Sequence, residues 1–204
     1  MAEKLIHNAY GLDGADATRN FYDKWAKTYE EEVTENGYAT PARCAAALAQ
    51  FASDPSAPVL DIGCGTGISG LALKDAGFAT LDGSDFSAEM LALAAAKGIY
   101  RRLHNTDLED PFPFTPGSYA NVSAIGVLNP GHAPAETLDL VLALLEPGGL
   151  FVFSLNDHAL GDNSYEARIS EHVDTGHAEL LFKEYGEHLP ELDLKSNVYV
   201  LRKS

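Results

Sequence analysis

The sequence predicts an α/β protein built around a doubly wound sheet of seven strands. Between residues 59 and 155, short apolar runs alternate with segments of helical period, as in a parallel sheet covered by helices on both faces. The end of the chain differs, because the strand-like runs 178–189 and 196–202 are separated only by Pro190-Glu191-Leu192-Asp193. So short a link predicts a hairpin, and the mostly parallel sheet is therefore expected to end in an antiparallel pair.

Helices are expected before the sheet begins. Residues 1–14 carry little periodic signal and predict a loose arm, whereas residues 16–33 place apolar side chains on one broad helical face. Thr40-Pro41 then predicts an N-cap followed by a proline in the first turn of a helix that ends near Phe51. The chain is expected to form one domain, 1–204, made of an arm (1–14), N-terminal helices (15–53) and a core (54–204).

The stretch Val59-Leu60-Asp61-Ile62-Gly63-Cys64-Gly65-Thr66-Gly67 is the centre of the predicted core. Its apolar residues suit a buried parallel strand, and three glycines at alternate positions let a ligand approach the backbone closely. A helix is expected over 68–76, with Gly77 as a left-handed stop. Such a loop offers backbone N–H groups and a positive helix end to a ligand.

The later elements follow the same alternation. Ser87 is expected to cap a helix over 88–97, and Gly98 to end it. Three prolines within 110–117 exclude regular structure there. The other expected elements are strands at 79–85, 100–106, 120–127 and 150–155, and helices at 135–145 and 164–173.

Composition restricts the partners. The net charge is −16, with 14 Lys and Arg against 30 Asp and Glu, which disfavours a nucleic-acid partner because polyanions are bound through clustered basic residues. No apolar run approaches the roughly 20 residues of a membrane span, and the first residues do not read as a secretory signal. We therefore expect a cytoplasmic protein, a monomer or homodimer, that binds a small molecule and neither a membrane nor nucleic acid. Neither the cysteines nor the histidines show metal-ligand spacing, so no metal is expected.

The glycine loop has two interpretations. Gly65-Thr66-Gly67-Ile68-Ser69-Gly70 matches the dinucleotide fingerprint, and Asp85 follows Gly65 at the distance of an acid that binds the ribose of NAD. Against this, the glycines begin one repeat earlier, at Gly63, and an acid, Asp61, lies within the strand end.

The series Asp61-x-Gly63-x-Gly65-x-Gly67 resembles the first motif of the class I S-adenosylmethionine (SAM)-dependent methyltransferases. Residues 83–91 resemble the family's second-strand pattern, 106–108 the acidic turn after the third strand, and 144–150 the Pro-Gly-Gly step before the fifth strand. The resemblance covers roughly residues 20–203. It implies a Rossmann-like fold of seven strands with a C-terminal antiparallel pair, SAM as cofactor and S-adenosylhomocysteine as product.

The N-terminal segment narrows the resemblance. Tyr22-Asp23-Lys24-Trp25-Ala26-Lys27-Thr28-Tyr29-Glu30 is similar to the YDxWAxxYE opening of small methyltransferase-like proteins, a subgroup that includes one of the Williams–Beuren region. This similarity implies a lid formed by Tyr22, Trp25 and Tyr29, with Tyr22 a candidate contact to the cofactor carboxylate. By spacing alone, the same stripe also suits the packing face of a helix.

The resemblance assigns the other cofactor-binding positions. The backbone at Gly63, Gly65 and Gly67 would contact the methionyl part and ribose of the cofactor. Cys64 lies among these positions, with the alternative of a small residue that the loop tolerates. Asp61 would lie near its ammonium group, or would instead be a structural acid that bonds the loop. Asp85 would accept hydrogen bonds from both ribose hydroxyls.

The adenine and the methyl group complete the implied site. Phe86 would pack on the adenine face and Met90 would close that pocket, although both positions also suit plain core. Asp107 would accept from the adenine amino group, with the Leu108 N–H nearby. The sulfonium would lie over the end of the fourth strand, at Ile125 and Gly126.

No catalytic residue is assigned from the sequence. Methyl transfer requires alignment of acceptor and donor, and a base only where the acceptor must lose a proton early. His132 and His158 follow the fourth and fifth strands and are the candidates, each with the alternative of a solvated loop histidine.

The expected reaction is transfer of a methyl group from SAM to an oxygen or nitrogen of a small molecule. No Asn-Pro-Pro-Tyr type motif follows the fourth strand, where the sequence is Gly126-Val127-Leu128-Asn129-Pro130, which disfavours methylation of adenine or amide nitrogens. The alternatives are a non-catalytic SAM-binding scaffold and an NAD(P)-binding oxidoreductase, although no Tyr-x-x-x-Lys pair supports the latter.

Overall fold

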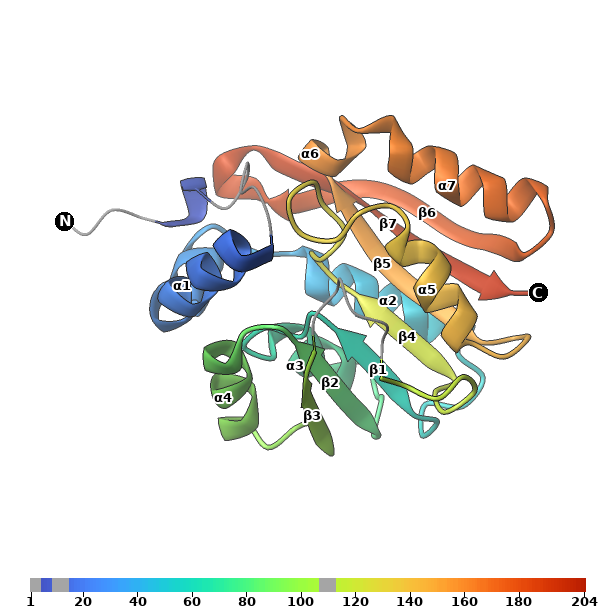
Figure 1. Cartoon of the computed structure of the whole chain (residues 1–204), viewed down its shortest axis with the longest axis horizontal. Coiled ribbons are helices and arrows are strands. Elements are labelled where there is room, and N and C mark those ends of the chain that lie inside the picture. The colour runs from blue at the N-terminus through green and yellow to red at the C-terminus, as the bar shows by residue number, and fades with distance from the viewer. Residues whose placement is uncertain (1–4, 9–14, 107–112) are drawn as a thin grey trace.

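A seven-stranded sheet forms the centre of the computed structural model, which describes residues 5–8, 15–106 and 113–204. Its strand order is β3-β2-β1-β4-β5-β7-β6 (Figure 1). Strands β1 to β5 pair in parallel, and β7 runs antiparallel between β5 and β6. The strands are β1 Val59–Ile62, β2 Leu81–Asp85, β3 Arg102–Asn105, β4 Asn121–Ala124, β5 Leu150–Asn156, β6 Ala178–Leu189 and β7 Leu194–Lys203. The predicted fold class is confirmed.

Helices cover both faces of the sheet. Alternate residues of β5 face opposite sides: Phe151 and Phe153 pack in one core with α5 and α7, whereas Leu150 and Val152 pack in another with α2 and α3. Burial on both faces explains why β5 is apolar from Leu150 to Phe153. The helices are η1 Leu5–Asn8, α1 Ala15–Glu35, α2 Thr40–Phe51, α3 Ile68–Asp75, α4 Ala88–Ala96, α5 Thr137–Leu144, α6 Asp157–Leu160, α7 Asn163–Asp174 and η2 Pro190–Leu192.

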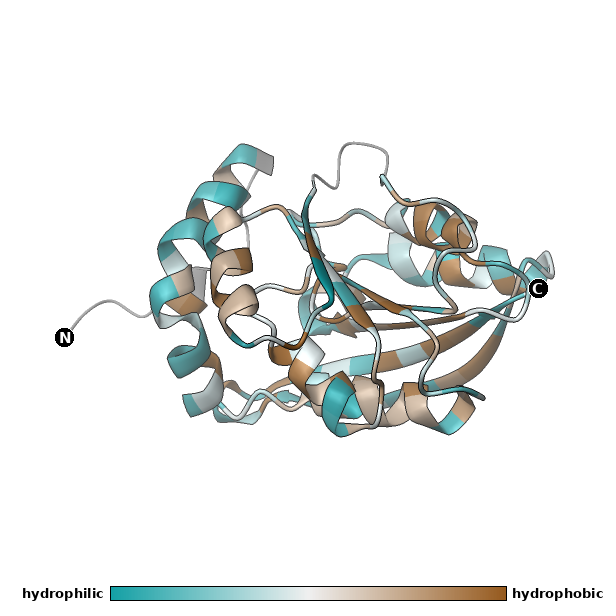
Figure 2. Cartoon of the chain, turned by 90° about the horizontal axis from the view of Figure 1, so that it is seen from below, coloured by the Kyte–Doolittle hydropathy of each residue, from teal (hydrophilic) through white to brown (hydrophobic). Residues whose placement is uncertain are grey.

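Helix α1 lies at one end of the molecule, beside α4 (Figure 1). Figure 2 shows it as mostly hydrophilic, in contrast to the largely hydrophobic strands. Its apolar stripe packs in a third, smaller core with Ile6 and Leu189. In the described part of the chain, no helix is long and apolar enough to cross a membrane.

Two capping predictions had different outcomes. Ser87 caps α4 as expected, because its hydroxyl accepts a hydrogen bond from the Met90 N–H at 3.1 Å. The prediction that Thr40 caps α2 is wrong: Thr40 is already helical, and Ala39 is at the cap without a side-chain bond. The Thr40 hydroxyl instead bonds His188 Nδ1 at 2.8 Å, since a buried imidazole requires a polar partner that the local sequence does not reveal.

Several boundaries differ from the predicted ones. Strand β4 ends at Ala124 rather than 127, because Gly126 has a left-handed φ of 73° that turns the chain. Helix α6 was not expected; the Asn156 carboxamide starts it by accepting from the Ala159 N–H at 3.0 Å. The link between β6 and β7 contains the short helix η2 and a left-handed Asp193, and β7 begins at Leu194.

Candidate functional site

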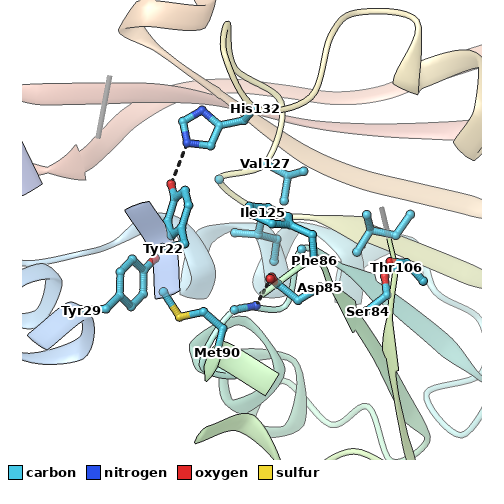
Figure 3. Close-up of a pocket in the computed structure, with 14 residues that line it drawn as sticks. Tyr22, Tyr29, Ser84, Asp85, Phe86, Met90, Thr106, Ile125, Val127 and His132 are labelled. Atoms are coloured by element: carbon cyan, nitrogen blue, oxygen red, sulfur yellow. Dashed lines mark hydrogen bonds between the residues drawn. The ribbon is translucent and has the colours of Figure 1, made fainter. Parts of the chain in front are cut away.

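A cavity opens where β1, β2 and β4 end, beside the point at which the strand order reverses between β1 and β4. It encloses about 610 Å³, counting the part open to solvent. In Figure 3, Tyr22 and His132 lie on one side of this cavity, and Asp85, Ser84 and Thr106 on the other. The lining residues are Tyr22, Tyr29, Ile62, Gly63, Gly65, Ser84, Asp85, Phe86, Met90, Thr106, Ile125, Gly126, Val127 and His132.

The glycine loop forms the floor of this cavity. Gly63 and Gly65 have left-handed φ angles of 64° and 53°. A Cβ at Gly63 would lie 2.4 Å from the Val127 side chain, so only glycine fits there. A Cβ at Gly65 would meet no atom within 4 Å and would enter open space at the cavity wall. The loop is thus shaped for close approach of a ligand to its backbone.

Asp85 links the loop to helix α4. Its two carboxylate oxygens accept hydrogen bonds from the N–H groups of Gly65 and Ser87, each at 2.9 Å. Burial raises the pKa of Asp85 to about 6, although both N–H groups favour its charged form. The carboxylate also lines the cavity, so its remaining lone pairs are available to hydroxyl groups of a ligand.

Asp61 lies beneath the loop and is not among the residues that line the cavity. It is fully buried and accepts hydrogen bonds from the hydroxyls of Ser69 at 2.6 Å, Tyr100 at 2.7 Å and Ser123 at 2.8 Å. Burial raises its pKa, and the three hydroxyls oppose that shift. This arrangement favours the structural interpretation of Asp61, with hydroxyls as partners rather than the expected loop N–H groups.

Cys64 is also buried beneath the loop and does not line the cavity. Burial, with the nearby carboxylates of Asp61 and Asp85, raises the pKa of its thiol well above the usual range. Its thiol is therefore protonated and unsuited to nucleophilic chemistry. Asp107 and Leu108 lie outside the described residues, although the adjacent Thr106 lines the cavity.

The aromatic stripe of α1 both packs and lines the cavity. Trp25 is 3% exposed and contacts Tyr29 edge to face, with ring centroids 4.8 Å apart. Tyr22 and Tyr29 reach the cavity, whereas Trp25 lines a neighbouring one. Tyr22 also contacts Phe86 at 5.9 Å between ring centroids. The stripe is therefore a packing face, and two of its residues also line the cavity, while the lid remains a prediction.

The two candidate bases differ in position. His132 lines the cavity, and its Nε2 is hydrogen-bonded to the Tyr22 hydroxyl at 2.8 Å (Figure 3). Burial lowers the pKa of His132, and the Pro130 carbonyl offsets this only in part, so the ring is neutral at pH 7. His158 is exposed on α6 and does not line the cavity. The expectation of a solvated histidine thus fits His158, which lies on α6 rather than in a loop, and does not fit His132.

Sequence reasoning missed part of the site. Ser84, Thr106 and Val127 line the cavity, and the only signal for them was their position at the ends of expected strands. Tyr100 was also missed, because its contacts are with residues that are distant in the sequence. A Cβ at Gly70 would lie 2.2 Å from the Tyr100 hydroxyl oxygen, so the position of Tyr100 requires a glycine at residue 70. In the described part of the chain, no cluster of three or more His, Cys, Asp or Glu could hold a metal ion.

Comparisons with known proteins agree on one family. Residues 36–196 match the family described as "Methyltransferase domain". Human methyltransferase-like protein 27 is 34% identical over 71% of this chain and 60% of its own length. The 18S rRNA (guanine(1575)-N(7))-methyltransferase of Saccharomyces cerevisiae is 30% identical over 57% of this chain and 47% of its own. The ubiquinone biosynthesis O-methyltransferase of Sodalis glossinidius is 33% identical over 47% of this chain and 40% of its own.

These alignments span at most 60% of each relative's length. Among solved structures, the [4+2]-cyclase SpnF superposes with a TM-score of 0.70 at 15% identity, covering 94% of this chain and 97% of its own. At that identity the likeness shows the fold alone.

Proposed function

Because the chain belongs to the class I SAM-dependent methyltransferases, whose cofactor is SAM, we propose that it transfers a methyl group from SAM to an oxygen or nitrogen of a small molecule. The observation that carries the proposal is the pairing of Asp85 with Gly65 at one cavity, which presents a carboxylate and an open loop backbone to the same ligand. SAM supplies the electrophilic methyl group when bound.

The residues of the cavity suit the parts of this cofactor. Asp85 can accept from the ribose hydroxyls while it keeps its bonds to Gly65 and Ser87. Phe86 and Met90 offer an apolar surface to the adenine, and both line the cavity. The open space beside Gly65 leaves room for the ligand next to the backbone.

His132 is the candidate base on the acceptor side. It lies across the cavity from Asp85 (Figure 3), and its lowered pKa keeps the imidazole able to accept a proton at neutral pH. The hydrogen bond to Tyr22 fixes the ring, so that the Tyr22 hydroxyl proton could move to Nε2 while the phenol oxygen takes up the proton that the acceptor loses.

The charge of the protein supports a small-molecule acceptor. A net charge of −16 repels a phosphate backbone. Because the yeast relative is named for 18S rRNA, the experiment below includes RNA among the acceptors tested. The relative named for ubiquinone biosynthesis is an O-methyltransferase, which is one of the two kinds of transfer proposed here.

A second candidate function is SAM binding without methyl transfer. Its specific support is the structural likeness to SpnF, a protein named as a [4+2]-cyclase, because it shows that this fold can carry other chemistry.

Transfer of a tritiated methyl group distinguishes methyl transfer from SAM binding alone. The protein is incubated with SAM carrying a tritiated methyl group and three separate pools: small metabolites, RNA and protein. We expect label in the small-molecule pool only. Label confined to RNA or protein would overturn the proposed acceptor class, and SAM binding with no label in any pool would favour the non-catalytic function.

A further inference from the structure

A second cavity adjoins the first on the side away from Asp85. The two share Tyr22, Tyr29, Gly126 and His132 in their walls. With the part open to solvent counted, the second cavity measures about 440 Å³ and the first about 610 Å³. Its other lining residues are Ile6, Trp25, Val33, Tyr38, Asn129, Asn156, His188 and Leu189.

Polar groups line this cavity, and one of them is buried without a hydrogen-bond partner in the described part of the chain. Trp25 is 3% exposed, and its indole N–H has no hydrogen-bond partner among the described residues. Asn129 is 5% exposed and lies in the wall of the cavity, where its carboxamide can donate and accept hydrogen bonds. Asn156 uses its oxygen to cap α6, which leaves its NH₂ group for another acceptor. Buried polar groups are normally satisfied, so the indole N–H of Trp25 points to a ligand or water.

The cavity wall carries no formal charge. Its described lining residues include no Asp, Glu, Lys or Arg. Its histidines are neutral at pH 7: burial lowers the pKa of His188 to about 4 and also lowers that of His132. A charged ligand would lose its hydration here without gaining a counter-charge, which is costly.

We propose that this second cavity holds the methyl acceptor, and that the acceptor is a small uncharged molecule with a flat apolar body and a group that hydrogen-bonds to the Asn129 carboxamide. The flat body would lie against Trp25 and Leu189, and the reacting atom would face the shared wall at His132. The inference rests on the proposed function, because it needs the donor in the adjoining cavity.

Trp25 provides a direct readout, because it is the single tryptophan of the chain and lies in the wall of this cavity. Benzamide, benzoate and benzylammonium share a ring and differ in charge, so they serve as probes. Each is titrated into the protein saturated with S-adenosylhomocysteine while the Trp25 emission is recorded. We expect a saturable change with benzamide and at least tenfold weaker binding of both ions.

Variants of Asn129, with a matched control, test whether benzamide binds in the second cavity. Asn129→Leu should weaken benzamide binding about tenfold by removing the hydrogen-bonding group, and Asn129→Ala should do the same without added bulk. Asn163→Leu, at an exposed position on α7, should leave binding unchanged. The melting temperature of each variant shows whether it is folded.

Three results would overturn the inference: an ion that binds as well as benzamide, benzamide binding that is unchanged in both Asn129 variants, or no saturable change with any probe. Calorimetry with S-adenosylhomocysteine alone is run in parallel. Loss of that binding would instead contradict the proposed function, so the two failures can be told apart.

Discussion

At the scale of single residues, Asp85 both links the glycine loop to the start of α4 and lines the cavity. It is 7% exposed, and its pKa of about 6 exceeds the roughly 3.9 of an unfolded chain. A carboxyl with a raised folded-state pKa favours folding below pH 4 and loses that contribution as the pH rises to 6, here about 3 kcal/mol. A ligand that donates hydrogen bonds to the ionised form would recover part of this free energy.

The affinity for SAM should therefore depend on pH near 6. In the proposed site the ionised Asp85 would accept hydrogen bonds from the ribose hydroxyls, so the affinity should be full above pH 7 and fall as the pH decreases through 6, by up to tenfold per unit. Calorimetric titrations between pH 5 and 8 measure this. Asp85→Asn should bind weakly without the step, and a flat curve for the unmodified protein would rule out the role.

Gly65→Ala should weaken SAM binding at least tenfold, because its Cβ would enter the open space at the cavity wall. The left-handed backbone adds a stability cost of about 1–2 kcal/mol. Gly77→Ala is the matched control: it also has a positive φ and open space around its Cβ, but it ends α3 away from the cavity. Both variants should melt at lower temperatures, and only the first should lose affinity. Equal affinities would contradict the assigned approach of the ligand.

His132→Gln should lower turnover about 100-fold on the acceptor found by label transfer, because a glutamine can hydrogen-bond to Tyr22 but cannot accept the proton. The dissociation constant of SAM should stay within twofold. His158→Gln, at an exposed position, should retain full turnover. Unchanged kcat in His132→Gln would exclude this histidine as the base.

At the scale of elements, polar contacts at the two ends of α4 hold α1 beside the site. The Ser87 hydroxyl donates to Asp23 Oδ1 at 2.5 Å, and Lys97 pairs with Glu30. Lys97 also donates to the Thr66 carbonyl of the glycine loop at 2.7 Å. One lysine of α4's C-terminal cap thus connects the helix that carries the aromatic stripe to the loop.

Lys97→Met should loosen α1 without unfolding the core, because it removes the charge and keeps the apolar stem. Losing about 1 kcal/mol should speed amide hydrogen exchange in α1 about fivefold, with β4 and β5 unchanged. Lys183→Met breaks an exposed pair with Glu166 and should leave α1 exchange as it is. If Lys97→Met also leaves it unchanged, the pair does not hold the helix.

Caps, stops and turns that depend on neighbouring residues could be predicted from the sequence. Contacts between elements that are distant in the sequence could not. The Ser87 cap, the Gly77 stop and the strand-to-loop step at Gly63 depend on neighbouring residues, and each is present as expected. The partners of Asp61 and Thr40 come from other elements, so the side-chain pattern near them could not reveal Tyr100 or His188. Of the candidate site, the positions on strand ends could be predicted, while the second cavity depends on how η1, α1 and α6 meet.

At the scale of the whole molecule, the order of the strands brings the residues of the site together. The reversal of strand order between β1 and β4 leaves a crevice at their carboxyl ends, and the loops after β1, β2 and β4 all reach it. Asp85 and His132 come from opposite halves of the sheet and therefore face each other across it. The net charge of −16 agrees with the small-molecule acceptor that we propose.

Titration calorimetry with SAM, S-adenosylhomocysteine and NAD tests most directly whether the cavity beside Asp85 is the cofactor site. We predict that the unmodified protein binds both sulfur compounds with a stoichiometry of one and does not bind NAD, and that Asp85→Asn binds both at least tenfold more weakly while remaining folded. If the protein bound neither sulfur compound, or if Asp85→Asn bound them with equal affinity, the assignment of this cavity as the cofactor site would be contradicted.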